Sequence, residues 1–387
     1  MKRVFLVVLD GIGVGGAEDA AAYGDAGSDT LGNVARAVGG LRLPVLESLG
    51  LGRIRPIEGL EPVARPRAAF GQAREASPAK DSTAGHWELC GLTLERPFPT
   101  YPDGFPPEVI AEFASRTGRG CIGNKAASGT AILDELGPRH VETGEWIVYT
   151  SADSVFQVAA HEGVVPVDEL YAACATARAM LAGEHAVSRV IARPFVGVPG
   201  AFARTPRRRD YSVPPTGPTL LDHLAARGVV RVGIGKVDDL FASKNIVSAH
   251  TPTNAAAYEL LGSALADVDS GLVFANVLEF DQTWGHRNDV PGFHRGLVEL
   301  DAALGGMLPM VREEDLLILA ADHGNDPTTP STDHSRENVP VLVFGPRARP
   351  VDLGVRASFA DVGQTVAEYF DVEPVGSGVS FLGAVGL

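Results

Sequence analysis

The chain has 387 residues, more than the ~100–200 residues of one ordinary domain, which predicts two domains or one large domain with an insertion. Hydrophobic residues make up 45% and charged residues 21%, a balance that supports a sizeable core and argues against disorder. The formal net charge of −15 argues against a general nucleic-acid binder, because neutralising phosphates requires a basic face. We therefore expect a globular protein with no nucleic-acid partner.

The three cysteines, Cys90, Cys121 and Cys174, are far apart and form no CxxC pair. They suit neither a disulfide framework nor a thiolate zinc site, so we expect buried thiols in a reducing cytoplasm. No apolar run approaches the ~20 residues of a transmembrane helix, so no membrane partner is expected. The start Met-Lys-Arg followed by Val4–Leu9 only faintly resembles a secretion signal, whose apolar core is usually ~7–15 residues long. We predict a buried strand there.

Several short apolar runs are closed by polar or glycine residues, which is typical of strands covered on both faces of a parallel sheet. These runs are Val4–Leu9, Val229–Ile234, Leu272–Leu278, Leu316–Ala321 and Val339–Phe344. Between them lie helical patterns at Thr30–Val38, Thr219–Ala226, Thr253–Leu265, His294–Leu304 and Val362–Phe370. The alternation predicts an α/β fold with a mostly parallel sheet flanked by helices.

The segment from Phe98 to Pro214 differs from the rest because proline-rich stretches border it on both sides. It contains its own expected strands and helix, at Trp146–Thr150, Val187–Val196 and around Val167–Leu181. A self-sufficient stretch on two connectors predicts an inserted domain. We expect residues 98–214 to form a smaller α/β cap that holds substrate, and residues 1–97 with 215–387 to form a discontinuous metal-binding catalytic core.

Aspartate and histidine residues follow three of the expected strands. They are Asp10, then Asp281 at the end of an expected strand Phe274–Phe280 with His286 five residues on, and then Asp322 with His323. The pair Asp333-His334 follows in a later loop. In open α/β sheets ligand sites lie outside the carboxyl ends of the strands, so we expect these side chains to converge. A single aspartate at a strand end is more often a turn or helix cap, but the repetition at three strand ends favours a metal site.

Six mixed oxygen and imidazole ligands exceed what one tetrahedral ion requires and suit two ions. Carboxylates with imidazoles and no thiolate favour Mn²⁺ or Zn²⁺ over Ca²⁺. Two metal ions ~3.5–4 Å apart stabilise the attacking and leaving oxygens of an in-line phosphoryl displacement. The predicted ligands are Asp10, Asp281, His286, Asp322, His323 and His334.

A candidate nucleophile lies in the segment Lys80–Glu88. Asp81 or Ser82 is expected to cap a helix that starts near Thr83 and directs backbone N–H groups at an anion. A threonine hydroxyl is a weak nucleophile until a metal or base favours its alkoxide form. The alternative interpretation is that Ser82 and Thr83 serve only as an N-cap.

The expected insertion adds basic and short polar side chains. Six of its arginines fall within 21 residues, at positions Arg189, Arg193, Arg204, Arg207, Arg208 and Arg209, and the planar guanidinium suits a phosphate-holding patch. A solvated loop is the alternative for Arg207–Arg209. Ser151–Val155 follows a strand and suits sugar hydroxyls, with a local turn as the alternative. Lys236 stands at another strand end and is expected to face the same cleft.

Six segments resemble motifs of the phosphopentomutases, a family of the alkaline-phosphatase superfamily. They are Val8–Gly13, Lys80–Glu88, Thr150–Phe156, Phe280–Arg287, Ala321–Asp326 and Thr332–Glu337, and the resemblance covers essentially the whole chain. The metal-ligand motifs are shared with phosphatases, sulfatases and cofactor-independent phosphoglycerate mutases. The segment Ser151–Gln157 is the one typical of pentomutases.

The resemblance implies an alkaline-phosphatase-like core with two Mn²⁺ ions, Zn²⁺ or another divalent ion being alternatives, and a phosphorylated Thr83. It places Asp10, Asp322 and His323 on one ion and Asp281, His286 and His334 on the other. It implies substrate contacts from Ser151, Asp153, Arg193, Arg208 and Lys236.

The expected activity is a cytoplasmic isomerase that interconverts ribose 1-phosphate and ribose 5-phosphate, and their 2-deoxy counterparts, through a pentose 1,5-bisphosphate. A sugar bisphosphate such as glucose 1,6-bisphosphate is the expected activator, and a monomer is the expected state. The alternatives are a phosphatase or phosphodiesterase with the same metals, a cofactor-independent phosphoglycerate-type mutase, and a non-catalytic sugar-phosphate binder.

Overall fold

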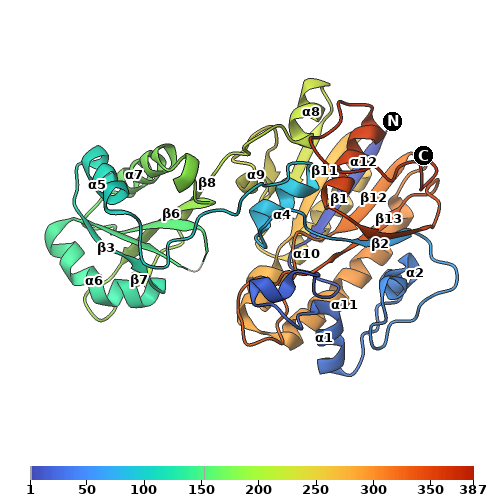
Figure 1. Ribbon diagram of the computed structural model, residues 1–387, viewed down its shortest axis with the longest axis horizontal. Helices are drawn as coiled ribbons and strands as arrows, with labels where there is room; N and C mark the ends of the chain where they lie inside the picture. Colours follow the sequence, from blue (N-terminus) through green and yellow to red (C-terminus); the bar gives the residue numbers. More distant parts are fainter. Residues whose placement is uncertain (1, 152) are drawn as a thin grey trace. The chain divides into compact units, whose positions relative to one another are not determined.

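The computed structural model describes residues 2–151 and 153–387, so Ala152 of the Ser151–Gln157 motif and Met1 of the faint signal lie outside the described residues. The chain divides into two compact units, which Figure 1 shows. The first, the core unit, comprises Met1–Pro97 and Pro215–Leu387, and the second, the inserted unit, comprises Phe98–Pro214. Both divisions fall at the proline-rich stretches.

The core unit is built on an eight-stranded sheet. Its strands, in spatial order, are β10 (Ser248–Ala249), β9 (Arg231–Ile234), β11 (Gly271–Val277), β1 (Arg3–Leu9), β12 (Asp315–Ala320), β13 (Val339–Phe344), β2 (Ala69–Ala73) and β14 (Asp352–Arg356). All neighbouring strands are parallel except for the two pairings of β13, which are antiparallel. The predicted α/β fold with a mostly parallel sheet is therefore confirmed. The strand predicted at Val339–Phe344 is the exception to the parallel arrangement, because it runs antiparallel to both of its neighbours.

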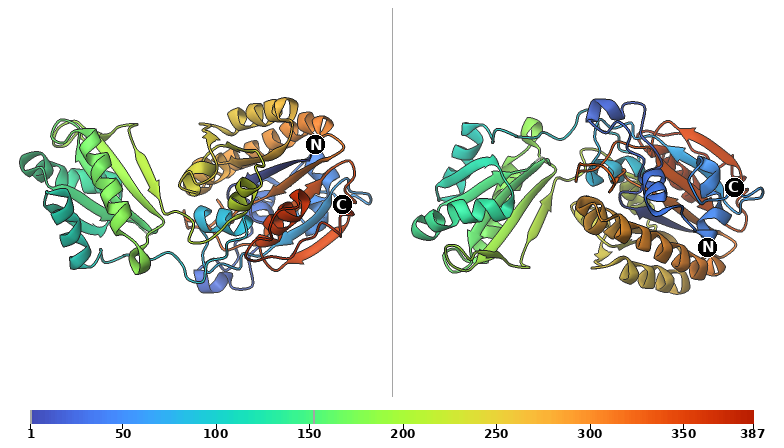
Figure 2. Two further views of the ribbon diagram at one scale, coloured as in Figure 1. Left: turned by 90° about the horizontal axis from the view of Figure 1, so that it is seen from above. Right: turned by 90° about the horizontal axis from the view of Figure 1, so that it is seen from below.

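Helices cover both faces of this sheet, as Figure 2 shows. One group packs around α11 (Val290–Met307) and contains α1 (Thr30–Val38), α2 (Pro44–Leu49) and α10 (Asn254–Asp267). The other group contains α4 (Ser82–Leu89), α8 (Leu220–Ala226), α9 (Val237–Leu240) and α12 (Ala360–Phe370), and α3 (Leu51–Ile54) packs on β2 and β13. All seven residues of β1 are buried because each face of this central strand is covered.

Short turns of 3₁₀ or π type complete the core unit. They are η1 (Ala20–Tyr23), η3 (Phe280–Trp284), η4 (Gly285–Arg287) and η5 (Leu308–Met310). The prediction that a strand Phe274–Phe280 runs directly into Asp281 is wrong, because β11 ends at Val277 and Asp281 lies in the π-helical turn η3. An apolar run does not reveal where a strand changes into a wide helical turn.

The inserted unit has its own six-stranded sheet. The order is β3 (Cys121–Ala126), β4 (Trp146–Thr150), β5 (Val155–His161), β6 (Arg189–Val196) and β7 (Ala203–Arg204), and β8 (Arg209–Ser212) also pairs with β6. Its helices are α5 (Pro107–Thr117), α6 (Gly129–Thr143) and α7 (Val167–Met180), with the 3₁₀ turn η2 (Gly183–His185). Alternate residues of β4 belong to two separate apolar clusters, Trp146 and Val148 to one and Ile147 and Tyr149 to the other. The period of two shows that both faces of this sheet are packed.

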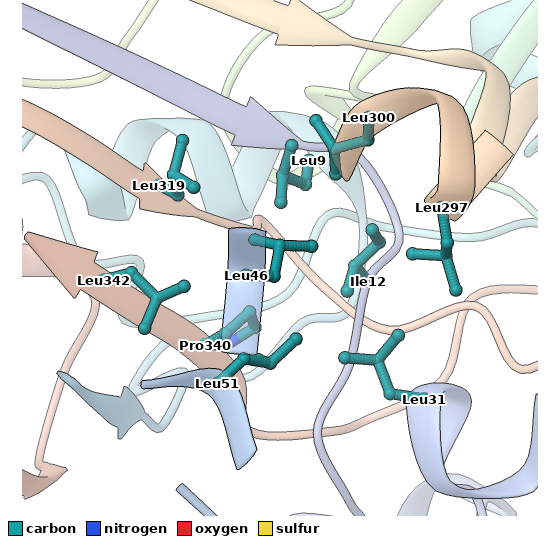
Figure 3. A pocket seen from close by; sticks show the side chains of 10 residues that line it. All are labelled: Leu9, Ile12, Leu31, Leu46, Leu51, Leu297, Leu300, Leu319, Pro340 and Leu342. Carbon is teal, nitrogen blue, oxygen red and sulfur yellow. The ribbon is translucent and has the colours of Figure 1, made fainter. Parts of the chain in front are cut away.

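A small apolar cavity lies in the core beside the end of β1 (Figure 3). Its lining residues are Leu9, Ile12, Leu31, Leu46, Leu51, Leu297, Leu300, Leu319, Pro340 and Leu342. An all-aliphatic lining has no polar group to orient a charged ligand, so this space belongs to the core rather than to a site. Among the described residues, no helix is long and apolar enough to cross a membrane.

Arg3 begins the central strand and is fully buried. Its guanidinium donates to both carboxylate oxygens of Asp315 on β12, at 2.8 and 2.5 Å. It also donates to the carbonyl oxygens of Leu265 and Val268 at 2.8 Å each, at the end of α10. These bonds join two neighbouring strands and a helix at one edge of the core, and a buried charge of this kind needs its partner.

We expect Arg3→Met to lower the free energy of unfolding by about 3–5 kcal/mol, because it leaves Asp315 buried without a cation. The double variant Arg3→Met/Asp315→Leu is expected to recover much of this loss, because it leaves no uncompensated charge. Urea unfolding followed by circular dichroism measures both. A double variant at least as unstable as Arg3→Met would contradict the argument.

Candidate metal centre

The three strands that precede the expected ligands are neighbours in the sheet, in the order β11-β1-β12. Their carboxyl ends therefore meet at one edge. Asp10 directly follows β1, Asp322 follows the end of β12 at Ala320, and Asp281 follows β11 in η3. All three carboxylates are buried, with exposed fractions of 6%, 0% and 7% for Asp10, Asp322 and Asp281.

Asp281 stands at the centre of the cluster. Its Oδ1 lies 3.3 Å from His334 Nε2 and its Oδ2 lies 3.2 Å from His286 Nε2, and ligand atoms of these three residues lie within 4.8 Å of one another. Asp281 also forms a group of the same size with Asp10 and His323. Asp322 Oδ2 lies 3.4 Å from His323 Nε2, so all six predicted ligands come together.

The histidines turn the same ring nitrogen toward the carboxylates. His286 Nδ1 lies 2.6 Å from the Thr332 carbonyl oxygen, and His323 Nδ1 lies 3.0 Å from the Gly324 carbonyl oxygen. Each Nδ1 therefore carries a hydrogen and donates it to the backbone, which leaves Nε2 facing the cluster. Backbone carbonyl groups thus fix the ring orientation that a metal ligand needs.

Charge compensation inside the cluster shifts several pKa values. Burial, and then the charges of Asp322 and Asp281, raise the pKa of Asp10. Burial also opposes ionisation of Asp281, but His334 and His286 hold its pKa well below its usual range. Burial opposes protonation of His286, yet the hydrogen bond and charge of Asp281 raise its pKa to about 9. Protonated histidines are thus the cations that compensate these carboxylates when no metal ion is bound.

The residues present fit a pair of divalent cations. Asp10 Oδ1 is buried and accepts no hydrogen bond from the residues that the structure describes. An orphaned carboxylate oxygen beside further carboxylates and imidazoles costs free energy unless a cation binds it. Carboxylate and imidazole donors without a thiolate suit Mn²⁺ or Zn²⁺.

Helix α4 brings the candidate nucleophile to this cluster. Asp81 is its N-cap and accepts hydrogen bonds from the amides of Thr83 and Ala84, at 3.0 and 3.2 Å. The interpretation of Ser82 or Thr83 as the N-cap is therefore wrong. The expectation that the first amides of the helix bind an anion is also wrong for Thr83 and Ala84, because Asp81 occupies both.

Because Asp81 caps α4, the hydroxyl groups of Ser82 and Thr83 are not needed for capping. Ser82 Oγ lies 3.0 Å from His323 Nε2, which joins the first turn of the helix to the cluster. Thr83 follows directly and is 3% exposed. The helix then packs on the backbone that follows β12, because a Cβ added at Gly85 would lie 2.1 Å from the Asp322 carbonyl oxygen.

Comparisons with known proteins agree with this geometry. A model of the Metalloenzyme superfamily matches residues 227–374, which include five of the six predicted ligands. The phosphopentomutase of Dictyoglomus turgidum is 54% identical over 387 residues, covering 100% of this chain and 98% of the relative. That of Carboxydothermus hydrogenoformans is 52% identical and covers 100% of both chains. The chain belongs to the phosphopentomutase family.

As a member of that family, the protein is an isomerase of the mutase type, and its family relationship to metalloenzymes agrees with a metal centre. Solved structures with low sequence identity share its fold. The Leishmania mexicana phosphoglycerate mutase has a TM-score of 0.51 at 14% identity, covering 98% of this chain and 97% of that one. The PH0037 protein of Pyrococcus horikoshii has a TM-score of 0.52 at 15% identity, covering 97% and 99%.

The predicted substrate residues fall in both units. Lys236 follows β9 in the core unit and donates to Gln282, which is next to Asp281. Ser151 and Asp153 follow β4 in the inserted unit, where Ser151 Oγ accepts from the Asp153 amide at 3.3 Å. This hydrogen bond forms the local turn that the sequence left open as an alternative.

The arginines of the inserted unit have different surroundings. Arg208 forms two hydrogen bonds of 2.6 Å with the Asp210 carboxylate, and Arg207 pairs with Glu162 at 3.1 Å. Both are exposed, as the solvated-loop alternative expects. Arg193 instead donates from Nε to the neutral amide oxygen of Gln157, at 3.1 Å. Burial, and then the nearby charges of Arg208 and other arginines, lower the pKa of Arg193 to about 10.

Three buried residues around the centre were missed by the sequence reasoning. Asn325 donates to Asp281 Oδ1 at 2.7 Å, Asn276 donates to Asp10 Oδ2 at 2.9 Å, and His86 Nδ1 lies 3.1 Å from Asp322 Oδ2. The signal for Asn276 was present, because a lone amide interrupts an otherwise apolar strand. His86 stands within the quoted motif Lys80–Glu88, but nothing in its spacing indicates a partner that follows β12.

We expect Gly85→Ala to reduce mutase activity by about 100-fold, because the new Cβ would push α4 away from the backbone of Asp322 and misplace Thr83. Intrinsic helix propensity alone would make the same change stabilising by about 1 kcal/mol. The control is Gly262→Ala in α10, where an added Cβ meets nothing within 4 Å and activity should not change. Steady-state kinetics with the two purified variants decides, and equal activity for both would contradict the close approach.

Proposed function

We propose that the protein interconverts ribose 1-phosphate and ribose 5-phosphate, and their 2-deoxy counterparts, through a phosphorylated Thr83. The observation that carries the proposal is the contact of Ser82 with His323, which holds the turn bearing Thr83 against six aspartate and histidine ligands. The phosphopentomutase names of full-length relatives at 54% and 52% identity support the substrate class.

The six ligands would hold two divalent cations, with Mn²⁺ as our proposal and Zn²⁺ or another divalent ion as the alternative. Asp10, Asp322 and His323 would bind one ion, and Asp281, His286 and His334 the other. Bound there, the two cations would neutralise charge on the phosphoryl group during its transfer. The buried position of the carboxylates favours this electrostatic effect, because few water molecules screen it.

The reaction consists of two transfers in opposite directions. In the first, the bond between phosphorus and Thr83 Oγ breaks while the free sugar hydroxyl forms a new bond to the same phosphorus, and the proton of that hydroxyl is released. The product is a pentose 1,5-bisphosphate. In the second, Thr83 Oγ takes the other phosphoryl group, and the sugar oxygen that it leaves regains a proton. A sugar bisphosphate such as glucose 1,6-bisphosphate would phosphorylate an unmodified Thr83 by the same second transfer.

Arg193 is the strongest candidate for binding the phosphate that does not react. Its half-buried guanidinium bonds a neutral amide, whereas Asp210 already compensates Arg208. The lowered pKa of Arg193 reflects burial beside other arginines, an environment that an anion would relieve. Ser151, Asp153 and Lys236 are proposed to bind sugar hydroxyls and phosphate, with Arg208 in a secondary role.

A cytoplasmic, monomeric enzyme acting on small sugar phosphates remains part of this proposal. Its three cysteines are free thiols, of which Cys90 and Cys174 are buried. Burial raises the pKa of Cys121 to about 12, which keeps that thiol protonated and unreactive. Unpaired thiols agree with a reducing compartment.

Purified protein incubated with ribose 1-phosphate, Mn²⁺ and a trace of glucose 1,6-bisphosphate is expected to form ribose 5-phosphate with little free phosphate. Thr83→Ala should lower this rate by on the order of 10³-fold or more, because it removes the hydroxyl proposed to carry the phosphoryl group. Thr93→Ala, which alters a threonine bonded to Ser377, is the control and should remain active. Free phosphate as the main product would indicate a phosphatase, and an active Thr83→Ala would exclude the phosphothreonine scheme.

Removal of divalent metal with a chelator is expected to abolish mutase activity, and added Mn²⁺ should restore it. Mn²⁺ at about 100 times its dissociation constant should also raise the free energy of unfolding by about 2.7 kcal/mol, because it binds only the folded state. Asp281→Asn, which weakens both ligand groups, should show neither restoration nor stabilisation at the same concentration. Full activity in the metal-free protein would refute the two-ion site.

A further inference from the structure

His86 and Asn276 lie directly behind the candidate metal ligands, and both are fully buried. His86 is on α4, one turn after Ser82, and Asn276 is on β11, next to β1 in the sheet. Neither residue belongs to the six ligands or contributes the nucleophile. Their side chains nevertheless contact Asp10, Asp322 and the backbone beside Thr83.

The surroundings of His86 fix its protonation pattern. Its Nδ1 lies 2.9 Å from the Ser82 carbonyl oxygen and 3.1 Å from Asp322 Oδ2, and both of these atoms can only accept. Nδ1 must therefore carry the hydrogen. Its Nε2 lies 3.1 Å from Asn276 Nδ2, which can only donate, so Nε2 is the accepting nitrogen. His86 thus donates from Nδ1 and accepts at Nε2.

The amide of Asn276 uses its NH₂ group in two directions. Nδ2 donates to Asp10 Oδ2 at 2.9 Å and faces His86 Nε2 at 3.1 Å. Its Oδ1 is buried and has no hydrogen-bond partner among the residues that the structure describes. An unpaired buried amide oxygen in an apolar strand costs free energy, so packing alone would favour an aliphatic residue here. The NH₂ group is what this position supplies.

We propose that His86 and Asn276 are positioning residues that form one hydrogen-bonded link from Asp10 through Asn276 and His86 to the Ser82 carbonyl group, with His86 Nδ1 also 3.1 Å from Asp322 Oδ2. The link sets the orientation of two ligand carboxylates and, through the first turn of α4, the place of Thr83. This inference rests on the proposed function.

Residues that hydrogen-bond a metal ligand from behind usually contribute ~10–100-fold to metal affinity, because they hold the ligand in its binding orientation before the metal binds. A purely structural role for the same two residues predicts something different. Loss of their hydrogen bonds would then lower the free energy of unfolding. The Mn²⁺ affinity, however, would not depend on whether a variant keeps a donor near the position of His86 Nδ1. The two roles are therefore separable by measuring Mn²⁺ affinity and thermal stability on the same variants.

The test uses the full chain stripped of metal, with Mn²⁺ binding measured by isothermal titration calorimetry and unfolding by calorimetry. His86→Phe keeps a ring against Phe274 but removes both nitrogens, and it should weaken Mn²⁺ binding at least ~10-fold. His86→Asn places an amide donor near the former Nδ1. It should bind Mn²⁺ more tightly than His86→Phe, although its smaller side chain leaves a cavity and lowers the melting temperature more.

Asn276→Leu removes the NH₂ group while keeping the branched shape of the side chain, and it provides an independent arm if His86→Phe does not fold. We expect a similar loss of Mn²⁺ affinity, and a double variant with His86→Phe no weaker than the more affected single variant. The matched control is His140→Phe in the inserted unit. That buried ring bonds the Glu145 carbonyl oxygen at 2.6 Å and accepts from the His161 amide at 2.8 Å, so stability should fall while Mn²⁺ affinity stays constant.

Mn²⁺ affinities of His86→Phe and Asn276→Leu within twofold of the unaltered protein would overturn this inference and leave the proposed function intact. Affinities that follow the melting temperatures, with His86→Asn the weakest, would overturn it as well. An unaltered protein that binds no Mn²⁺ and isomerises ribose 1-phosphate without metal would instead overturn the proposed function itself. The two failures are therefore distinguishable.

Discussion

Repulsion between three buried carboxylates is the constraint on which the rest of this structure depends. Asp10, Asp281 and Asp322 are together because β11, β1 and β12 are adjacent and parallel, and because each aspartate follows the carboxyl end of its strand. Gathering such charges in a dry site opposes folding unless cations accompany them. His286 and His323, whose pKa values the neighbouring carboxylates raise, supply that charge, and divalent ions would replace their protons. The cluster is therefore unfavourable for folding by itself, and it places the ligand atoms where cations would bind.

The position of Thr83 follows from how tightly α4 is held against this cluster. At its start, Asp81 closes the first turn, and Gly85 lets the helix backbone reach the backbone of Asp322. At its end, buried Glu88 accepts hydrogen bonds from the amides of Ala76, Ser77 and Phe359, at 2.8, 2.7 and 3.0 Å. A reacting group fixed from both ends loses little further entropy during reaction, which is the condition for efficient group transfer.

The sequence predicted those features that local patterns and strand order decide. Val339–Phe344 and Thr30–Val38 have the expected bounds, and the apolar periodicity explains this agreement because it is a local property. The convergence of the ligands followed from a general rule about strand ends, which needs no coordinates. The sequence could not predict which side chains contact each other when they are far apart along the chain. His86 and Asp322 are more than two hundred positions apart, and no spacing rule connects a helix residue to a strand end at that separation.

The same reasoning explains why the basic residues were harder to interpret than the acidic ones. A run of arginines indicates positive charge, but its binding capacity depends on which carboxylates fold against it. Asp210 compensates Arg208 and Glu162 compensates Arg207, whereas Arg193 donates to an uncharged amide and sits half-buried beside like charges. A guanidinium that bonds a neutral amide in a partly dry site attracts an anion more strongly than one bonded to a carboxylate. Pairing, rather than the number of arginines, therefore decides where a phosphate group would bind in the inserted unit.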